Sequence, residues 1–363
     1  MASKVKTKTT QKSTSRPKGF QPQKPPSVGE SQLNHLLRRK VAESKLADLT
    51  DEEIITALFF QGVDPDLAQK ELQLVEGHPY FQASERFLQL HRKLESIMAI
   101  RQQLTRLSSR SGQVEICSDP ELSSQDFLDC YYATNTPVCL KGMIQNWSAL
   151  TRWSPEYLRS AYGEVEVEVQ MGRQANPRYE RELEKHRCTL SLREYVDRIV
   201  ASGPSNDLYM VANNGNLDRD ELQGLLADIQ FIPQLLDPTE TKGKVFFWFG
   251  PAGTITPLHH DPLNVLFSQV YGCKRFKLIS PDQTPWLYNR SGVFSEVNPA
   301  QPDDDRFPLF NNVQVLELIV EPGDVLFIPV GWWHWVESLE VSISLSFTNF
   351  LFPNSFEWQN PLL

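Results

Sequence analysis

The stretch Gly253-Thr254-Ile255-Thr256-Pro257-Leu258-His259-His260-Asp261-Pro262 holds the densest chemical pattern in the chain. In an extended strand the side chains alternate between two faces, so His259 and Asp261 point to one side and His260 points to the other. Two side chains that bind metals therefore converge without any bend in the backbone. An isolated His-x-Asp pattern is weak evidence, so its meaning depends on further candidate ligands elsewhere in the chain.

A third metal-ligand candidate ends the stretch Pro322-Gly323-Asp324-Val325-Leu326-Phe327-Ile328-Pro329-Val330-Gly331-Trp332-Trp333-His334. Two imidazoles and one carboxylate on one face of a metal leave the opposite positions open, which suits a non-haem Fe(II) that reacts with O₂. Catalytic zinc sites also use two histidines and a carboxylate, so the ligands alone do not select the metal. We expect Asp324 to shape the turn by bonding backbone amides, without a catalytic role.

Lys274 bears on the choice between iron and zinc. A lysine on the next stretch of chain can pair with the carboxylate of an acidic co-substrate, which hydrolytic zinc does not require. Taken alone, Lys274 would be a solvated surface lysine, and His334 among three tryptophans would be a packed histidine. In chain order, with the Gly-Thr-x-Thr-Pro lead-in and the Pro-Gly-Asp turn, they form a far more specific pattern.

The chain after Gly112 is typical of short strands joined by Gly and Pro turns. A helix-like stretch over residues 123–132 opens this part, and the helical period does not dominate again. Many short strands of this kind predict a sandwich or barrel rather than alternating strands and helices. The strand candidates are residues 136–140, 165–171, 208–211, 244–249, 264–270, 275–279, 313–320, 325–328 and 341–347.

A helical region is predicted at 31–110. Thr50-Asp51-Glu52-Glu53 resembles a capping box, Asp64-Pro65 opens a second helix, and a longer helix follows Pro79. A packing face against the following domain is the simplest interpretation of an apolar stripe on that long helix, and the seam of a homodimer is the alternative. The stripe consists of Phe87, Leu90, Leu94, Ile97, Met98 and Leu104.

The first 30 residues differ from the rest of the chain in charge. The 363 residues carry a formal net charge of -9, yet seven basic side chains precede the first acidic residue, Glu30. Because this segment combines four prolines with a polar background, we predict a disordered basic leader over residues 1–30. Such a leader could contact nucleic acid, but a solvated segment is the favoured interpretation.

Composition bounds the class of protein. With 40% hydrophobic residues and a mass of 41.6 kDa, the chain has enough length for one large domain and a smaller one. Five cysteines without a CxxC pair indicate neither a disulfide framework nor a zinc ribbon. No apolar run approaches the roughly 20 residues that span a bilayer, and the N-terminus has no signal-peptide core. We therefore expect a soluble, cytoplasmic protein without a membrane partner.

At the two quoted stretches the sequence resembles the JmjC family, in particular its cupin-like hydroxylase branch. The resemblance runs from about Val114 to Phe352 and is strongest over 248–262 and 322–335. It implies a mainly β catalytic domain over residues 111–363, folded as a double-stranded β-helix, which is a cupin-like jelly-roll. The N-terminal helical region lies outside that domain.

The resemblance also assigns roles to single residues. It implies that His259, Asp261 and His334 are the catalytic Fe(II) ligands, and that Thr256 and Lys274 bind the far carboxylate of the co-substrate 2-oxoglutarate, with O₂ as the oxidant.

Two further positions match co-substrate contacts in the family, namely Tyr209 and Ser346. One position departs from the pattern: many relatives have asparagine four residues after the ligand aspartate, where this chain has Val265 and places Asn264 one residue earlier. On a strand this shift reverses the face, so the role of Asn264 stays open.

The function implied by the resemblance is that of an Fe(II)- and 2-oxoglutarate-dependent dioxygenase that hydroxylates a protein or peptide side chain. The alternatives within the same chemistry are hydroxylation of an RNA nucleoside or a small metabolite, and N-methyl demethylation. A non-catalytic cupin scaffold, which uses the helical region for assembly, is an alternative of a different class.

Overall fold

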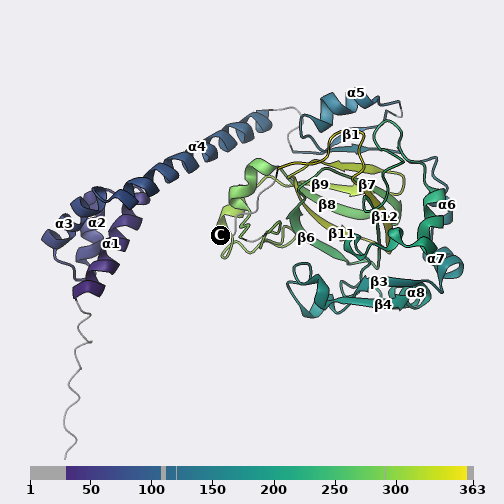
Figure 1. The fold of residues 1–363 in the computed structure, drawn as a ribbon, viewed down its shortest axis with the longest axis horizontal. Coiled ribbons are helices and arrows are strands. Elements are labelled where there is room, and N and C mark those ends of the chain that lie inside the picture. Colours follow the sequence, from purple (N-terminus) through teal and green to yellow (C-terminus); the bar gives the residue numbers. More distant parts are fainter. Residues whose placement is uncertain (1–29, 108–111, 120, 291, 358–363) are drawn as a thin grey trace, which may run out of the picture. The chain divides into compact units, whose positions relative to one another are not determined.

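The computed structural model describes residues 30–107, 112–119, 121–290 and 292–357 (Figure 1). Its contacts divide the chain into two compact units, Met1–Leu94 and Glu95–Leu363. The predicted disordered leader lies outside the described residues except for Glu30, where the first helix begins. The domain boundary expected at residue 110 stays a prediction.

The first unit is helical, as predicted. The second helix begins with a capping box, because the Thr50 side chain accepts from the Glu53 amide at 3.3 Å and the Glu53 carboxylate accepts from the Thr50 amide at 2.8 Å. Asp64 caps the third helix and Pro65 is its first residue. The helices are α1 (Glu30–Leu46), α2 (Asp51–Phe59), α3 (Pro65–Glu76) and the first part of α4 (Pro79–Leu107).

The apolar stripe of α4 is exposed. Phe87 exposes 74% of its surface and Leu94 52%, and Leu90, Ile97 and Leu104 lie between these values. Of the helix residues whose side chains the structure describes, Gln102 alone is buried. Met98, the sixth residue of the stripe, is half-buried, so the expected packing face is exposed at the other five positions.

The second unit contains the strands of the chain (Figure 1). Strand order is β1-β2-β10-β7-β12-β5 in a six-stranded sheet, β6-β11-β8-β9 in a four-stranded sheet, and β3-β4 in a two-stranded sheet. The strands are β1 (Glu115–Cys117), β2 (Val138–Leu140), β3 (Glu166–Gln170), β4 (Arg187–Ser191), β5 (Val245–Gly250), β6 (Ile255–His260), β7 (Val265–Tyr271), β8 (Lys274–Ile279), β9 (Leu316–Val320), β10 (Val325–Ile328), β11 (Trp333–Ser338) and β12 (Ser342–Phe347).

The two larger sheets face each other across a shared core. Phe267 of β7 and Phe276 of β8 meet edge to face with ring centroids 4.9 Å apart, and Leu326 of β10 and Val336 of β11 belong to the same buried cluster. The predicted cupin-like, jelly-roll fold with an N-terminal helical region is confirmed, with its strands in two facing sheets rather than a closed barrel.

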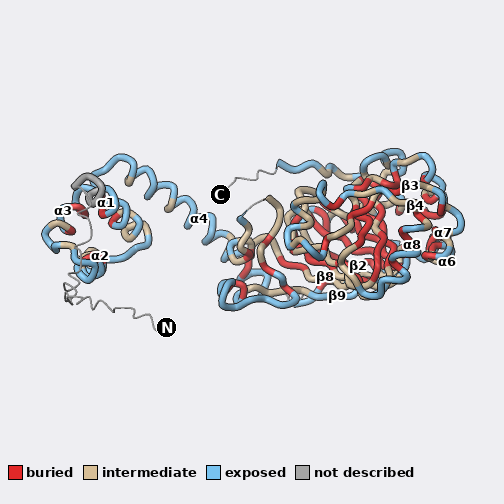
Figure 2. Tube along the Cα trace, turned by 90° about the horizontal axis from the view of Figure 1, so that it is seen from below, coloured by how far each residue is buried: buried red, intermediate tan, exposed pale blue. Residues whose placement is uncertain are grey.

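Strand β12 of the six-stranded sheet is buried along its whole length, and Figure 2 shows buried residues concentrated in the strand-rich unit. Helices pack on this sheet, and Trp153, at the end of α6, lies against Phe247 of β5 with ring centroids 5.8 Å apart. The helical period returns in these short helices but does not dominate the unit, in agreement with the expectation. The helices of this unit are α5 (Ser124–Phe127), α6 (Ala149–Arg152), α7 (Pro155–Tyr162) and α8 (Leu192–Ala201).

Most predicted strands are present, and the differences have more than one cause. The strand predicted at 325–328 agrees with β10, whereas residues 208–211 form only isolated bridges, from Tyr209 to Gln170 and from Met210 to Phe249. The sequence signal missed β11, which is buried on both faces and so lacks the alternation of polar and apolar residues that marks a half-buried strand.

Membrane-spanning helices and disulfides are both absent from the part of the chain that the structure describes. Within these ranges, no helix combines the length and apolar character needed to cross a bilayer. The five cysteines are free thiols.

The Pro-Gly-Asp turn before β10 is held by Asp324, as predicted. Its carboxylate is 4% exposed, accepts from the Glu321 amide at 3.0 Å and pairs with the Lys141 ammonium at 2.5 Å. Gly323 has a φ of 99°, and a Cβ there would lie 2.1 Å from the Gln145 side chain. The turn therefore depends on these two residue types.

We expect Asp324→Ala to lower the free energy of unfolding by about 1–3 kcal/mol, because the Glu321 amide and the Lys141 ammonium lose a buried acceptor. Asp324→Asn keeps an acceptor for the amide and should lose less. Urea unfolding of the three proteins measures the difference, and an alanine variant as stable as the wild type would contradict this account of the turn.

Candidate metal centre

His259 and His334 are direct neighbours across a strand pair. In the antiparallel pairing of β11 with β6, His334 lies opposite His259, and their ring centroids are 4.1 Å apart. Side chains at opposed positions of two strands project from the same face of a sheet. The register of these two strands therefore brings together two residues that are 75 positions apart in the sequence.

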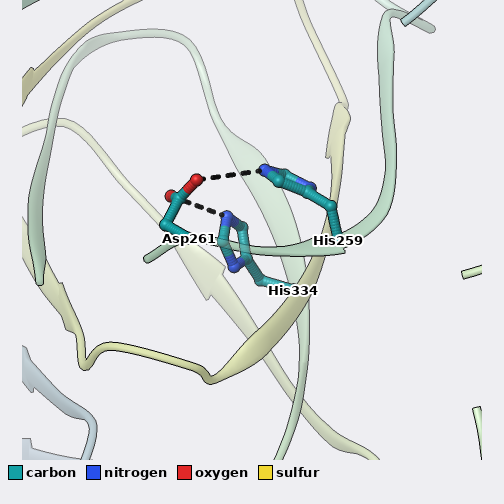
Figure 3. A group of neighbouring side chains, drawn as sticks. All are labelled: His259, Asp261 and His334. Atoms are coloured by element: carbon teal, nitrogen blue, oxygen red, sulfur yellow. Dashed lines mark ion pairs between the residues drawn. The ribbon is translucent and has the colours of Figure 1, made fainter. Parts of the chain in front are cut away.

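Asp261 completes the group from the residue just beyond the end of β6 (Figure 3). Its Oδ1 lies 4.0 Å from His259 Nε2, and its Oδ2 lies 3.6 Å from His334 Nε2. One donor atom from each of the three residues falls within 4.8 Å of the others. Among the described residues this is the group of His, Cys, Asp and Glu side chains that meets the geometry of a metal site.

The second nitrogen of each imidazole bonds to a backbone carbonyl. His259 Nδ1 lies 2.8 Å from the Pro257 carbonyl oxygen, and His334 Nδ1 lies 3.0 Å from the Trp332 carbonyl oxygen. A carbonyl only accepts, so both Nδ1 atoms carry the proton and both Nε2 lone pairs point towards Asp261. These partners, which sequence reasoning did not identify, orient both rings for metal binding.

Burial keeps His334 neutral. The side chain is 5% exposed, and the pKa of its imidazole is lowered to about 4, first by burial and then by the neighbouring His259, against the opposing effect of Asp261. A neutral imidazole has a lone pair for a metal at every pH near neutrality. His260 points away from this group, as predicted, and packs its ring against Trp333 at 4.7 Å.

All seven predicted site residues line one cavity of about 500 Å³. The same cavity has apolar walls from both facing sheets, among them Phe267 of β7 and Phe276 of β8. The site residues that meet there are Tyr209, Thr256, His259, Asp261, Lys274, His334 and Ser346.

Lys274 is a buried cation in this cavity. It is 1% exposed, and its Nζ donates to the Tyr209 hydroxyl at 2.7 Å. The rings of Trp248 and Phe267 lie 5.9 and 5.5 Å from the same nitrogen. Burial, followed by the charge of Arg173, lowers the pKa of this amine to about 7. A buried lysine that pairs with no carboxylate of the described residues suits an anion that arrives from outside.

Ser346 and Trp248 form another polar contact on the cavity wall. Ser346 is 3% exposed on β12, and its hydroxyl accepts from Trp248 Nε1 at 2.9 Å. Sequence reasoning missed Trp248 as a lining residue, although it begins the first of the two most characteristic stretches. Tyr209 is 2% exposed, and burial raises the pKa of its phenol, so the hydroxyl is protonated near neutrality.

Asn264 has a structural role. The sequence left this role open because Asn264 lies one residue before the position that asparagine occupies in many relatives. Its Oδ1 accepts from the Val330 amide at 2.7 Å, and its own amide donates to Asn354 Oδ1 at 2.8 Å. Val265 lines the cavity in its place. Asn264 therefore holds the turn that precedes β11 and so supports His334 from outside the cavity.

The donor set fits a divalent transition metal. Two Nε2 atoms and one carboxylate lie close together on the wall of the cavity, so further positions of a metal bound there would stay open to small ligands. This arrangement suits non-haem Fe(II) and is also compatible with catalytic zinc.

Comparison with known proteins gives a consistent result. Residues 124–356 match the family described as Cupin-like domain. The chain is 32% identical over 232 residues to Lysine-specific demethylase 8 of Xenopus tropicalis, covering 62% of this chain and 50% of that protein. It is 32% identical over 261 residues to Jumonji C domain-containing protein 5 of Drosophila melanogaster, covering 67% and 61%.

A third relative carries a different kind of name. HSPB1-associated protein 1 of Homo sapiens is 30% identical over 230 residues, covering 58% of this chain and 47% of that protein. The chain thus spans about half the length of the relatives that it matches.

We expect His259→Ala and His334→Ala each to weaken Fe(II) binding by about 100-fold or more, since loss of an outer partner alone costs 10–100-fold. Anaerobic titration with Fe(II) measures the affinity. His260→Ala, on the same strand, is the matched control and should keep the affinity of the wild type. Equal affinity in all four proteins would remove this centre as the metal site.

Lys274 should make the stability of the ligand-free protein depend on pH. The pKa of Lys274 in the folded protein, about 7, lies below that of a lysine in the unfolded chain. The folded state therefore binds fewer protons than the unfolded state between about pH 7 and pH 10. Relative to Lys274→Met, the wild type should therefore gain about 1.4 kcal/mol of unfolding free energy per pH unit in this window.

Urea unfolding at several pH values measures this difference, and below pH 7 it should be constant. Lys244→Met removes a lysine from an exposed ion pair with Glu240 and is the control. A flat difference between the wild type and Lys274→Met would show that the amine titrates like an ordinary lysine.

Proposed function

Because the chain belongs to the JmjC, cupin-like family, we propose that it is an Fe(II)- and 2-oxoglutarate-dependent oxygenase. The observation that carries the proposal is the pairing of His334 with His259 beside Asp261, in a cavity that also holds a buried lysine. The metal with its co-substrate and O₂ supplies the oxidising chemistry when bound.

Two groups of residues in the cavity would have different roles, one in metal binding and one in co-substrate binding. His259, Asp261 and His334 would hold the metal on one face and leave the other face open. At the other end Lys274 and the hydroxyl of Tyr209 would bind the far carboxylate of 2-oxoglutarate. Such a contact fixes the length and direction of the co-substrate relative to the metal.

Thr256 and Ser346 are proposed as further polar contacts on the wall. Thr256 lies opposite Val336 beyond a register shift in the β6–β11 pairing, and it lines the same cavity as the two histidines. The side chains of Phe267 and Phe276 give the cavity apolar walls. Apolar surroundings strengthen a charged contact at Lys274 and protect reactive species from side reactions.

Lys274 favours iron chemistry over zinc hydrolysis. A hydrolytic zinc site requires water at the metal, but it does not require a buried ammonium group across the cavity. Burial of this amine costs free energy in the empty protein, as its lowered pKa indicates. A binding site for an anionic co-substrate gives a reason for that cost.

Hydroxylation of a protein or peptide side chain is the leading proposal for the reaction. Demethylation of N-methyl-lysine is the second candidate, because relatives from Xenopus tropicalis and Danio rerio are named Lysine-specific demethylase 8. Both reactions begin by oxidation of a C–H bond. Hydroxylation of an RNA nucleoside or a small metabolite, for which the basic leader would be a handle, is a further alternative. The cytoplasmic location and the homodimer also stay predictions.

Mass spectrometry separates the two leading reactions. The protein is loaded with Fe(II), 2-oxoglutarate and O₂ and is given two peptide pools, one with unmodified side chains and one with N-methylated lysine. Hydroxylation adds a single oxygen to an unmodified peptide. Demethylation removes a methyl group and releases formaldehyde, and this result would replace the leading proposal.

We expect His259→Ala to abolish succinate formation from 2-oxoglutarate, and Lys274→Ala mainly to raise the 2-oxoglutarate concentration required. The first variant loses a metal ligand, and the second loses the cation that binds the far carboxylate. Wild-type turnover in either variant would contradict the assignment. A non-catalytic scaffold is favoured instead if anaerobic Fe(II) and 2-oxoglutarate leave the melting temperature of the wild type unchanged.

A further inference from the structure

Arg173 is a second buried cation next to the cavity, and the roles proposed above do not use it. It belongs to η2 (Arg173–Ala175) and is 1% exposed. One of its nitrogens, Nη2, donates to the Glu180 carboxylate at 2.7 Å and to the Ile255 carbonyl at 2.9 Å. Glu180 itself lines the cavity.

Two tyrosine rings flank the guanidinium. Its central carbon lies 4.4 Å from the ring centroid of Tyr179 and 5.1 Å from that of Tyr209. Among the described residues, the Nε and Nη1 atoms of Arg173 have no hydrogen-bond partner. A buried charged group with unpaired donors costs free energy, so its place beside Tyr209 is not explained by stability alone.

Tyr209 connects Arg173 to Lys274. The Lys274 nitrogen lies 5.2 Å from the same ring centroid and donates to the hydroxyl of that ring at 2.7 Å. Both cations therefore contact one aromatic ring, and their separation is no greater than the two ring distances together. All three side chains are buried, and in such surroundings two positive charges at this distance repel each other.

The surroundings of Lys274 offer little to offset this repulsion. The groups packed closest are the rings of Trp248 and Phe267 and the Tyr209 hydroxyl, which is protonated near neutrality. The acidic group Glu180, whose charge acts on Tyr209, already bonds to Arg173. At the other end of the cavity the titratable groups are those of the metal centre, His259, Asp261 and His334.

We propose that Arg173 is a positioning residue that holds Tyr209 against Lys274 and makes binding of a carboxylate at Lys274 take up one proton. The inference rests on the proposed function, because the carboxylate is the far end of 2-oxoglutarate. Its physical basis is the Tyr209 ring, which both cations contact. The Arg173 guanidinium packs on this ring and orients its hydroxyl. The positive charge of Arg173 disfavours the ammonium form of Lys274 until a carboxylate binds.

As a consequence, the part of the cavity around Lys274 binds a carboxylate together with a proton. Before binding, the Lys274 amine is largely neutral at pH 8, in keeping with its lowered pKa. The carboxylate of 2-oxoglutarate then favours the ammonium form, and the amine takes its proton from the solvent with no other bond made or broken. Affinity for 2-oxoglutarate should therefore fall as the pH rises above about 7.

Calorimetry measures the proton directly. The protein is preloaded with Fe(II) in the absence of O₂, so that the metal-bound histidines do not gain or lose protons during the titration. 2-Oxoglutarate is then added between pH 6 and pH 9 in two buffers of different ionisation enthalpy. In the wild type the number of protons taken up should rise from near zero at pH 6 towards one at pH 8. Lys274→Met should take up none at any pH.

Two variants with opposite expected shifts test Arg173 itself. Arg173→Met removes the repelling charge and should move the midpoint of proton uptake to higher pH by about one unit. Glu180→Gln keeps an acceptor for Arg173 but leaves the charge of Arg173 unbalanced, and should move the midpoint to lower pH. A purely structural role for Arg173 would produce neither shift.

Arg173→Lys separates charge from stacking. It keeps the positive charge, so the proton profile should stay near that of the wild type, while loss of the planar stack on Tyr209 should weaken 2-oxoglutarate binding several-fold. If Arg173→Met does not fold, Glu180→Gln alone tests the inference. The inference is overturned if the midpoint of proton uptake in Glu180→Gln equals that of the wild type.

The failure of this inference differs from failure of the proposed function. If the wild type does not bind 2-oxoglutarate at all, the oxygenase proposal falls and this inference falls with it. If the wild type binds 2-oxoglutarate and takes up a proton, but Arg173→Met and Glu180→Gln keep the wild-type midpoint, the oxygenase proposal stands and only the role of Arg173 is rejected.

Discussion

The register between β6 and β11 is the constraint on which the site depends. It places His334 opposite His259, and a slip of one residue would turn one of the two histidines to the other face of the sheet. Asp261 needs no such register, because it follows β6 directly. The carbonyls that orient both rings belong to the same two chain segments, so the pairing also fixes the direction of the lone pairs.

The same sheet pair builds the cavity between its two faces. Lys274 begins β8, next to β11, and its ammonium reaches Tyr209, which lies on a connecting segment with single bridges to β3 and β5. The proposed site thus combines a candidate metal centre made within one sheet with a proposed carboxylate site made between a sheet and a connecting segment. Burial acts at both ends, lowering the pKa of His334 and of Lys274.

Much of this arrangement could be predicted because it depends on short-range pattern. The spacing of His259 and Asp261, the turn signal before β10 and the capping box of α2 each reflect geometry over a few residues. Helices α7 and α8 and strand β11 were missed. Burial on both faces hides a strand, and the short helices have too few turns for their periodicity to stand out.

The sequence by itself determined the family pattern, the three candidate ligands and the lysine, because residue type and local spacing carry that information. Only the tertiary structure decided which groups meet across the fold. It showed that Asn264 holds the Val330 turn outside the cavity and that Arg173 shares the Tyr209 ring with Lys274. Such contacts join segments that are distant in the chain, and their free energy depends on burial and on charge separation, which appear only when the chain is folded.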